Sequence, residues 1–116
     1  MKDLTELRNA MRVFVAERDW EQFHSPKNLA MAMSVEVAEL LEHFQWLTES
    51  ASAELDEATR QAVADEIADV QIYLVRLADR LGIDILPACE AKLARNAIKY
   101  PVAKARGRAD KYTRLE

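Results

Sequence analysis

The chain is poor in the residues that interrupt or cross-link a polypeptide. Its 116 residues include two glycines, three prolines and one cysteine. So little glycine and proline favours long helices over a turn-rich β architecture. The single Cys89 excludes an internal disulfide and favours a reducing, cytoplasmic setting. No apolar run approaches the roughly 18–20 residues that span a bilayer, and the first residues lack a secretory-signal pattern, so we expect a soluble protein without a membrane partner.

Basic residues interleaved with aromatic ones are also missing, which argues against nucleic-acid binding. The charges are distributed unevenly: residues 1–91 carry 18 acidic and 8 basic side chains, whereas residues 92–116 carry 2 and 8. A basic end in a chain with an acidic region suits a polyanionic ligand such as a triphosphate. A solvated basic tail is the alternative.

Hydrophobic spacing predicts four helices in one globular domain. They are expected over residues 3–18, from Pro26 to about Leu47, from the residue 53–57 region to Leu81, and from about Asp84 to the residue before Tyr100. Residues 48–53 are predicted to be a polar loop. The fold class is therefore an all-α four-helix bundle, with a domain over residues 1–101 and a loosely ordered basic tail over residues 102–116.

Two pairs of acidic residues share one pattern in the second and third helices. Glu36 and Glu39 form the first pair, and Glu66 and Asp69 form the second. Residues three apart lie on one helix face. Each pair lies within the pattern A-x-x-x-E-x-x-[E/D]-x-x-x-[H/Y], which ends at His43 in the first copy and at Tyr73 in the second. The two stripes have the same orientation to their apolar faces, so helices packed through them would bring four carboxylates to one cleft.

Apolar residues beside the carboxylates are expected to form the core. The predicted core positions are Leu29, Met33, Val37, Leu40 and Phe44 on the second helix and Ile67, Val70 and Leu74 on the third. Ile72 and Val75 lie outside this stripe. A helix that is apolar on more than one side is buried on more than one side, so a partner subunit is the expected cover.

Four carboxylates in a shared cleft need a cation to balance them. Hard oxygen ligands favour Mg²⁺, with Mn²⁺ as the other possibility. We therefore expect Glu36, Glu39, Glu66 and Asp69 to bind the metal and to be catalytic. Solvated surface charge is the alternative for either pair alone.

Other residues carry two interpretations each. Trp20 and Trp46 are either core residues or stacking partners for a nucleobase. Tyr73 is a core hydroxyl or a ligand contact, and His43 is at most a residue that supports the metal ligands. Lys92, Asn96 and Lys99 share one face of the fourth helix and either contact phosphate or face solvent. A di-iron bundle would need two Glu-x-x-His pairs, which the sequence does not contain.

These residues resemble the all-α nucleoside triphosphate pyrophosphohydrolases of the MazG-like superfamily, whose hallmark is E-x-x-E followed after a spacer by E-x-x-D. The similarity extends to the dCTP pyrophosphatase branch. It covers nearly the whole chain, through the runs Glu17-Arg-Asp-Trp20-Glu-Gln-Phe-His24, Phe44-Gln-Trp46, Asp69-Val-Gln-Ile-Tyr73, Asn96 ahead of Tyr100-Pro101, and Lys111-Tyr112-Thr113.

The resemblance implies Mg²⁺-dependent hydrolysis of a nucleoside triphosphate, such as dCTP or a related or modified pyrimidine nucleotide, to its monophosphate and pyrophosphate. It implies nucleotide contacts from Trp20, Glu21, Gln22, Phe23, His24, Trp46, Tyr73 and Asn96, and assembly as a homodimer or homotetramer. The branch has a substrate-contacting histidine nine residues before the loop tryptophan, where this chain has Met11, so the resemblance does not carry a cytosine preference. A non-catalytic helical interaction module with acidic stripes is the alternative.

Overall fold

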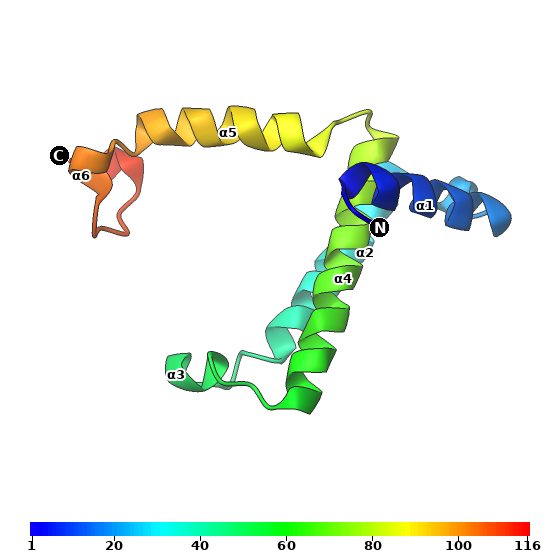
Figure 1. The fold of residues 1–116 in the computed structure, drawn as a ribbon, viewed down its shortest axis with the longest axis horizontal. Helices are drawn as coiled ribbons and strands as arrows, with labels where there is room; N and C mark the ends of the chain where they lie inside the picture. The colour runs from blue at the N-terminus through cyan, green and yellow to red at the C-terminus, as the bar shows by residue number, and fades with distance from the viewer. The chain divides into compact units, whose positions relative to one another are not determined.

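A computed structural model describes residues 1–116, and every regular element in it is helical (Figure 1). The four long helices are α1 (Leu4–Glu17), α2 (Pro26–Glu42), α4 (Glu57–Arg80) and α5 (Ile85–Lys99). The short elements are the 3₁₀ turns η1 (Glu21–Phe23) and η2 (Tyr112–Arg114) and the helices α3 (Glu49–Ser52) and α6 (Val102–Ala105). The all-α class and the four long helices are confirmed. No helix combines the length and apolar character needed to cross a membrane.

The chain divides into two compact units, Met1–Gly82 and Ile83–Glu116. Gly82 ends the first unit with a φ of 66°, a left-handed conformation that glycine adopts without strain. In the second unit, η2 folds back on the end of α5, where the rings of Tyr100 and Tyr112 meet edge to face with centroids 6.0 Å apart. The domain boundary expected at residues 101 and 102 stays a prediction.

Polar side chains cap three of the helix starts that the sequence indicated. The Asp3 carboxylate accepts a hydrogen bond from the Glu6 backbone N–H at 2.8 Å. The Ser25 hydroxyl accepts one from the Asn28 N–H at 3.1 Å, directly before Pro26 in the first turn of α2. The Asp56 carboxylate accepts one from the Thr59 N–H at 2.7 Å. These bonds satisfy backbone donors that have no partner within a helix.

We expect Ser25→Ala to lower the free energy of unfolding by about 1 kcal/mol, because it removes this cap from α2. Urea denaturation followed by circular dichroism measures the change. Ser34→Ala is the matched control, since the Ser34 hydroxyl only donates to the Met31 carbonyl within the exposed middle of the same helix. A Ser25→Ala protein as stable as the Ser34→Ala protein would contradict the capping assignment.

The second helix is shorter than predicted, and the loop after it is not wholly irregular. α2 ends at Glu42, and residues 43–46 form turns in which the Phe44 N–H donates to the Leu41 carbonyl at 2.9 Å. Thr48 then caps α3 by accepting from the Ala51 N–H at 3.1 Å. The prediction of a polar loop over residues 48–53 is therefore wrong, because Thr48 caps one helical turn within this segment.

In the first unit, α2 and α4 form a helical hairpin, with α3 at its closed end and α1 packed against α4 (Figure 1). The buried residues include Val15 of α1, Leu29 of α2, and Val63 and Val75 of α4, of which Val15 and Leu29 are fully buried. Leu29 was predicted to be in the core. Val75 was expected to need a partner subunit, and this expectation is wrong because Val75 is only 3% exposed within the single chain.

Three residues that were predicted to be in the core are exposed in the structure. Val37, Ile67 and Leu74 are 45%, 54% and 38% exposed. The other predicted core positions, Met33, Leu40, Phe44 and Val70, are half-buried, and so are Ala32 and Ala62 of the acidic stripe. The predicted apolar stripe is therefore only partly covered within the single chain.

Candidate active site

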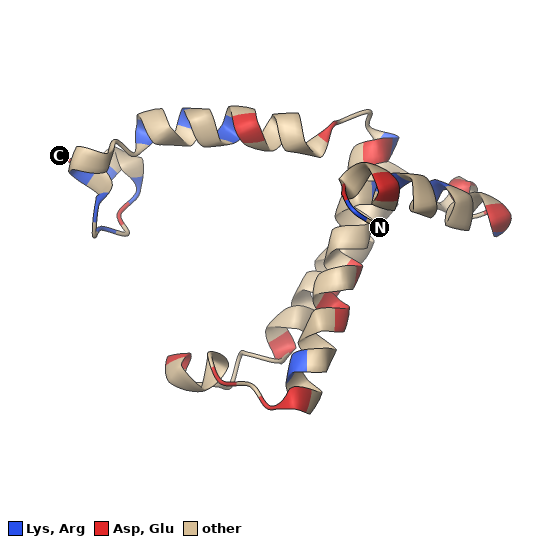
Figure 2. Ribbon diagram, in the orientation of Figure 1, with Lys and Arg blue, Asp and Glu red and all other residues tan.

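Carboxylates from both helices of the hairpin meet between them. Carboxylate oxygens of Glu36, Glu39 and Glu66 lie within 4.8 Å of one another. Glu36 and Glu39 are on one face of α2 by their i, i+3 spacing, and α4 supplies Glu66 from the opposite side. We call these three residues the carboxylate cluster. The three side chains are half-buried. Figure 2 colours the acidic positions along α4 red.

The cluster holds anionic oxygens that have no donor to balance them. One carboxylate oxygen of Glu36 and one of Glu66 are buried without a hydrogen-bond partner. Burial, followed by the neighbouring carboxyl groups of Glu39 and Glu66, raises the pKa of Glu36 from 4.5 to about 7. A proton or a cation therefore has to occupy the cluster near neutral pH.

A divalent cation fits this cluster by donor type and by size. The donors are all carboxylate oxygens, which suit Mg²⁺ and Mn²⁺. Opposite ligands of such an ion are about 4.2 Å apart, so ligand atoms separated by up to 4.8 Å need only small side-chain movements to reach it. The two unpartnered buried oxygens are then satisfied.

Asp69, the fourth predicted ligand, lies beside the cluster but is not part of it. It is exposed, and its charge contributes to the raised pKa of Glu36. Asp69 also lines a cavity of about 320 Å³ with Met11, Phe14, Val15, Trp20, His24, Ile72, Tyr73 and Arg76. We call this cavity the loop pocket. Asp69 is thus a neighbour of the carboxylate cluster and a lining residue of a mostly apolar pocket.

The loop after α1 gives the pocket its tryptophan. Asp19 adopts a left-handed conformation with a φ of 52°, which aspartate tolerates better than most residues. At this bend the backbone N–H of Trp20 donates to the Val15 carbonyl at 3.1 Å. The indole meets Phe14 edge to face at 5.8 Å between centroids and lies 6.5 Å from the His24 ring.

Only two of the five predicted loop contacts line the pocket, namely Trp20 and His24. Glu21 is exposed and lies 3.9 Å from Arg76. Gln22 donates its side-chain amide to the Asp19 carbonyl at 3.0 Å, and Phe23 is 60% exposed. Glu21 and Gln22 thus make contacts with protein groups, and nucleotide contact by Glu21, Gln22 or Phe23 stays a prediction.

The residues after α2 lie elsewhere. Trp46 is 88% exposed beyond the end of α2, whereas Trp20 follows α1 at the other end of the hairpin. Trp46 is not a lining residue of the loop pocket. His43 lines a separate cavity with Leu47, Ala51, Glu54, Leu55, Asp56 and Thr59. A nucleotide contact by Trp46 stays a prediction.

The three predicted phosphate contacts lie on α5, in the second unit. Lys92 is exposed and Asn96 is half-buried. The Lys99 ammonium lies 4.9 Å from the centroid of the Tyr112 ring, a cation–π contact within its own unit. Basic residues predominate along the later part of α5 and on α6 (Figure 2). Phosphate contact by these residues stays a prediction.

Five lining residues of the loop pocket were not predicted to be site residues, namely Met11, Phe14, Val15, Ile72 and Arg76. Met11 was noted only as the residue at the position of the branch's histidine, and Ile72 only as lying outside the core stripe. Arg76 received no role, although it is 3% exposed. A signal was available: Asp69, Ile72, Tyr73 and Arg76 follow i, i+3, i+4, i+7 spacing, which places them on one helix face.

Comparison with known proteins identifies the family of the chain. The model of the MazG-like family matches residues 31–115. dCTP pyrophosphatase 1 of Mus musculus is 46% identical over 114 residues, covering 97% of this chain and 67% of the relative. The Homo sapiens protein of the same name is 43% identical over the same coverage. A crystal structure of a pyrophosphatase from Archaeoglobus fulgidus superimposes with a TM-score of 0.80 and 44% identity, covering 84% of this chain and 91% of that one.

These relatives are enzymes, so the alternative of a non-catalytic interaction module is set aside. The family resemblance drawn from the sequence is confirmed. The chain belongs to the MazG-like family, and it is an enzyme of the nucleoside triphosphate diphosphatase class.

Proposed function

We propose that this enzyme hydrolyses a pyrimidine deoxynucleoside triphosphate, dCTP or a related or modified nucleotide, to its monophosphate and pyrophosphate in a Mg²⁺-dependent reaction. The observation that carries the proposal is the position of Asp69, which adjoins the carboxylate cluster and lines the loop pocket. A triphosphate at the cluster can thus place its base in the pocket. The named activity of the relatives supports dCTP as the first substrate to test.

Glu36, Glu39 and Glu66, with Asp69 from the next turn of α4, would hold the cation. When bound, Mg²⁺ supplies positive charge that stabilises the negative charge developing on the phosphate oxygens. The chain's own contribution is to hold the α-phosphate beside the cluster. One of these four carboxylates orients a water molecule through an oxygen that does not bind the cation, and it accepts the proton as the water attacks the α-phosphorus and pyrophosphate leaves.

The loop pocket is the proposed base site. Its lining is mostly apolar and aromatic, as expected for a surface that receives a flat ring. Trp20 offers an indole face, while Tyr73 and His24 supply polar groups. Met11 occupies the position at which the dCTP branch has a histidine, so the thioether is expected to tolerate a modified base at that side of the pocket.

Lys92, Asn96 and Lys99 remain the proposed contacts for the β- and γ-phosphates. The positive charge of the two lysines and the amide donor of Asn96 suit the outgoing pyrophosphate. The exposed thiol of Cys89 agrees with a reducing compartment, and we place the enzyme in the cytoplasm.

Self-association is the other part of the proposal. Val37, Leu41 and Ile67 of the hairpin are 45%, 58% and 54% exposed. Apolar side chains repeated along both helices favour a homodimer or homotetramer, since a second copy would cover them. Sedimentation equilibrium of the full chain decides between these states, and a monomer at micromolar concentration would overturn this part.

A pyrophosphate-release screen tests the proposed function. Canonical and modified nucleoside triphosphates are supplied with Mg²⁺, with Mn²⁺, or with a chelator. The proposal expects release from dCTP or a related pyrimidine nucleotide, dependent on the metal. Activity confined to purine nucleotides would contradict the proposed base class, and full activity in chelator would contradict the metal dependence.

We expect Trp20→Ala to raise KM for the best pyrimidine nucleotide about tenfold, because stacking on an aromatic side chain contributes about 1–3 kcal/mol per base. Val13→Ala is the control, since Val13 is an exposed apolar residue of the neighbouring helix α1 and lies outside the pocket. Steady-state kinetics and thermal denaturation of both variants separate binding from folding. Equal KM values for Trp20→Ala and the wild type would contradict the base-pocket assignment.

A further inference from the structure

Arg76 is a buried cation for which the proposed reaction has no use. Its side chain is 4% exposed, although it lies on α4 one heptad beyond Asp69. Arginine is rarely buried unless it has specific partners. Its Nη2 atom is buried without a hydrogen-bond partner, and the nearest carboxylate oxygen, on Glu21, is 3.9 Å away.

One partner of Arg76 is the imidazole that lines the loop pocket. The Arg76 Nε–H donates to Nδ1 of His24 at 3.2 Å. The guanidinium has no acceptor atoms and stays protonated, so it can only donate. Nδ1 of His24 must therefore be the acceptor, and the ring proton must be on Nε2.

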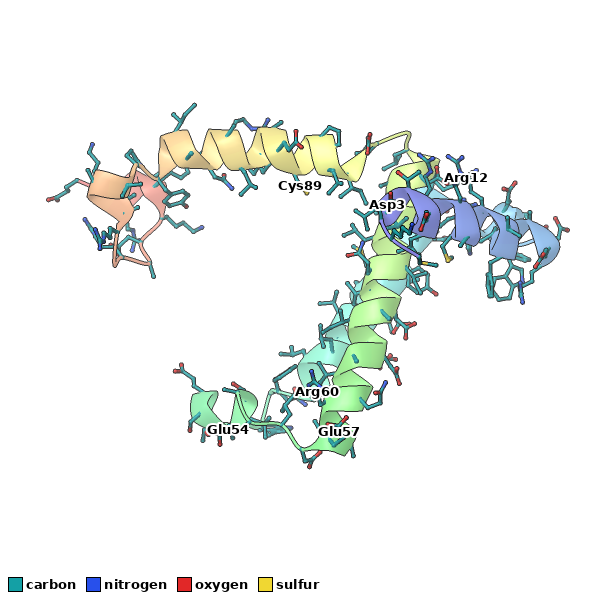
Figure 3. The ribbon with its side chains drawn as sticks, viewed as in Figure 1. Asp3, Arg12, Glu54, Glu57, Arg60 and Cys89 are labelled. Atoms are coloured by element: carbon teal, nitrogen blue, oxygen red, sulfur yellow. The ribbon has the colours of Figure 1, made fainter.

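A network fixes the position of Arg76. Its Nη1 lies 3.5 Å from Asp79, and Asp79 accepts two hydrogen bonds from Arg12 of α1 at 2.8 and 2.5 Å. Arg12 is labelled on α1 in Figure 3. The Arg12 guanidinium also holds the pKa of the Asp79 carboxyl below its ordinary value. Because Asp79 stays anionic, it provides a charged partner that holds the Arg76 guanidinium in place.

A second arginine holds the same loop by its backbone. The Arg80 Nε–H donates to the His24 carbonyl at 3.1 Å. Burial, followed by the charges of Arg76 and Arg80, lowers the pKa of His24, and Glu21 opposes this effect. The imidazole is thus kept neutral, with one donor and no positive charge.

We infer that Arg76 is a positioning residue that fixes His24 as the neutral Nε2–H tautomer, so that the loop pocket offers a hydrogen-bond donor to an acceptor on the edge of the bound base. This inference rests on the proposed function and deepens it. Pyrimidine bases have a carbonyl acceptor at O2, which is the class of group that such a donor recognises. The apolar lining strengthens the selection, since an unpaired donor or acceptor is costly where water is excluded.

The tautomer is directly measurable because the chain contains two histidines, His24 and His43. Long-range ¹H–¹⁵N spectra distinguish the protonated ring nitrogen, and His43→Gln assigns the signals. We expect the Nε2–H form of His24 in the wild type. We expect Arg76→Leu to give a mixture of tautomers and a higher His24 pKa. A wild-type His24 protonated at Nδ1 would overturn the inference without any assay of activity.

Two variants separate the role of Arg76 from charge and from loop position. Arg76→Lys keeps a positive charge but lacks the planar fork of donors, and we expect it to lose the fixed tautomer. Arg80→Leu removes the bond to the His24 backbone and leaves the bond to the ring, so the Nε2–H form should persist. A fixed tautomer in Arg76→Lys and Arg76→Leu, or its loss in Arg80→Leu, would overturn the inference. Circular dichroism verifies that each variant is folded.

Kinetics then test recognition of the base. For Arg76→Leu we expect KM for dCTP to rise about tenfold with kcat within about twofold of wild type, since a lost hydrogen bond is worth about 1 kcal/mol or more. The inhibition constant of inorganic tripolyphosphate, which has no base, should not change. An unchanged KM, or an equal loss of affinity for tripolyphosphate, would overturn the inference. If the wild type hydrolyses no nucleotide, the proposed function fails, and the tautomer measurement still stands separately.

Discussion

Glu66→Gln is expected to lower the rate of pyrophosphate release by about a thousandfold or more at saturating substrate and metal. Glutamine keeps the size of the side chain but replaces an anionic oxygen with a neutral amide. One oxygen of Glu66 is buried without a hydrogen-bond partner, so the amide meets a site built for a cation. A loss of this size corresponds to about 4 kcal/mol of transition-state stabilisation, within the range expected for a displaced catalytic ion.

The control is Asp65→Asn, which makes the same chemical change one residue earlier on α4. Asp65 is exposed and outside the carboxylate cluster, so we expect its kinetics to match the wild type. Glu66→Gln should be folded and at least as stable without metal, because it removes one of several crowded negative charges. Wild-type release by Glu66→Gln would overturn the assignment of the cluster, whereas equal losses in both variants would point to a general effect of charge.

The acidic pairs were predictable because i, i+3 spacing on a helix is set by local geometry alone. The sequence has no information on how far one helix slides along its neighbour. The two helices of the hairpin are antiparallel. When Glu36 lies opposite Glu66, Glu39 and Asp69 therefore lie on opposite sides of that pair along the helix axes. This explains why three carboxylates cluster while Asp69 adjoins the loop pocket.

The core was harder to predict than the helices. Angular patterns correctly placed Leu29 inside, but they could not give the rotation at which α2 and α4 pack against each other. Val37 and Ile67 are exposed as a result, and α1 packs against α4, on which Val75 is buried. Arg76 was missed for a similar reason: hydrophobic periodicity treats arginine as a surface residue. Its burial is accompanied by a tertiary contact to His24 of the loop and by an ion pair with Asp79 three residues later on the same helix.

The affinity of the enzyme for Mg²⁺ is expected to fall about tenfold for each pH unit below 7 and to level off above it. The pKa of Glu36 is about 7 in the folded protein without a cation. Below that pH a cation must displace a proton, and one displaced proton changes the apparent binding constant tenfold per unit. Between pH 7 and pH 5 the loss approaches a hundredfold. Titration calorimetry with Mn²⁺ or Mg²⁺ at several pH values measures it, together with the proton released.

The raised pKa of Glu36 also predicts how the stability of the metal-free protein depends on pH. Between pH 4.5 and about 7 the folded state holds a proton on Glu36 that the unfolded chain releases. The unfolded state therefore binds fewer protons, and the free energy of unfolding falls as the pH rises through this window. Added Mg²⁺ should reverse the trend, since the cation binds only the folded, deprotonated site. Glu36→Gln should flatten both pH dependences, whereas Glu42→Gln, on the exposed side of the same helix, should leave both unchanged. A Glu36→Gln protein with the wild-type pH dependence would show that another group carries the proton.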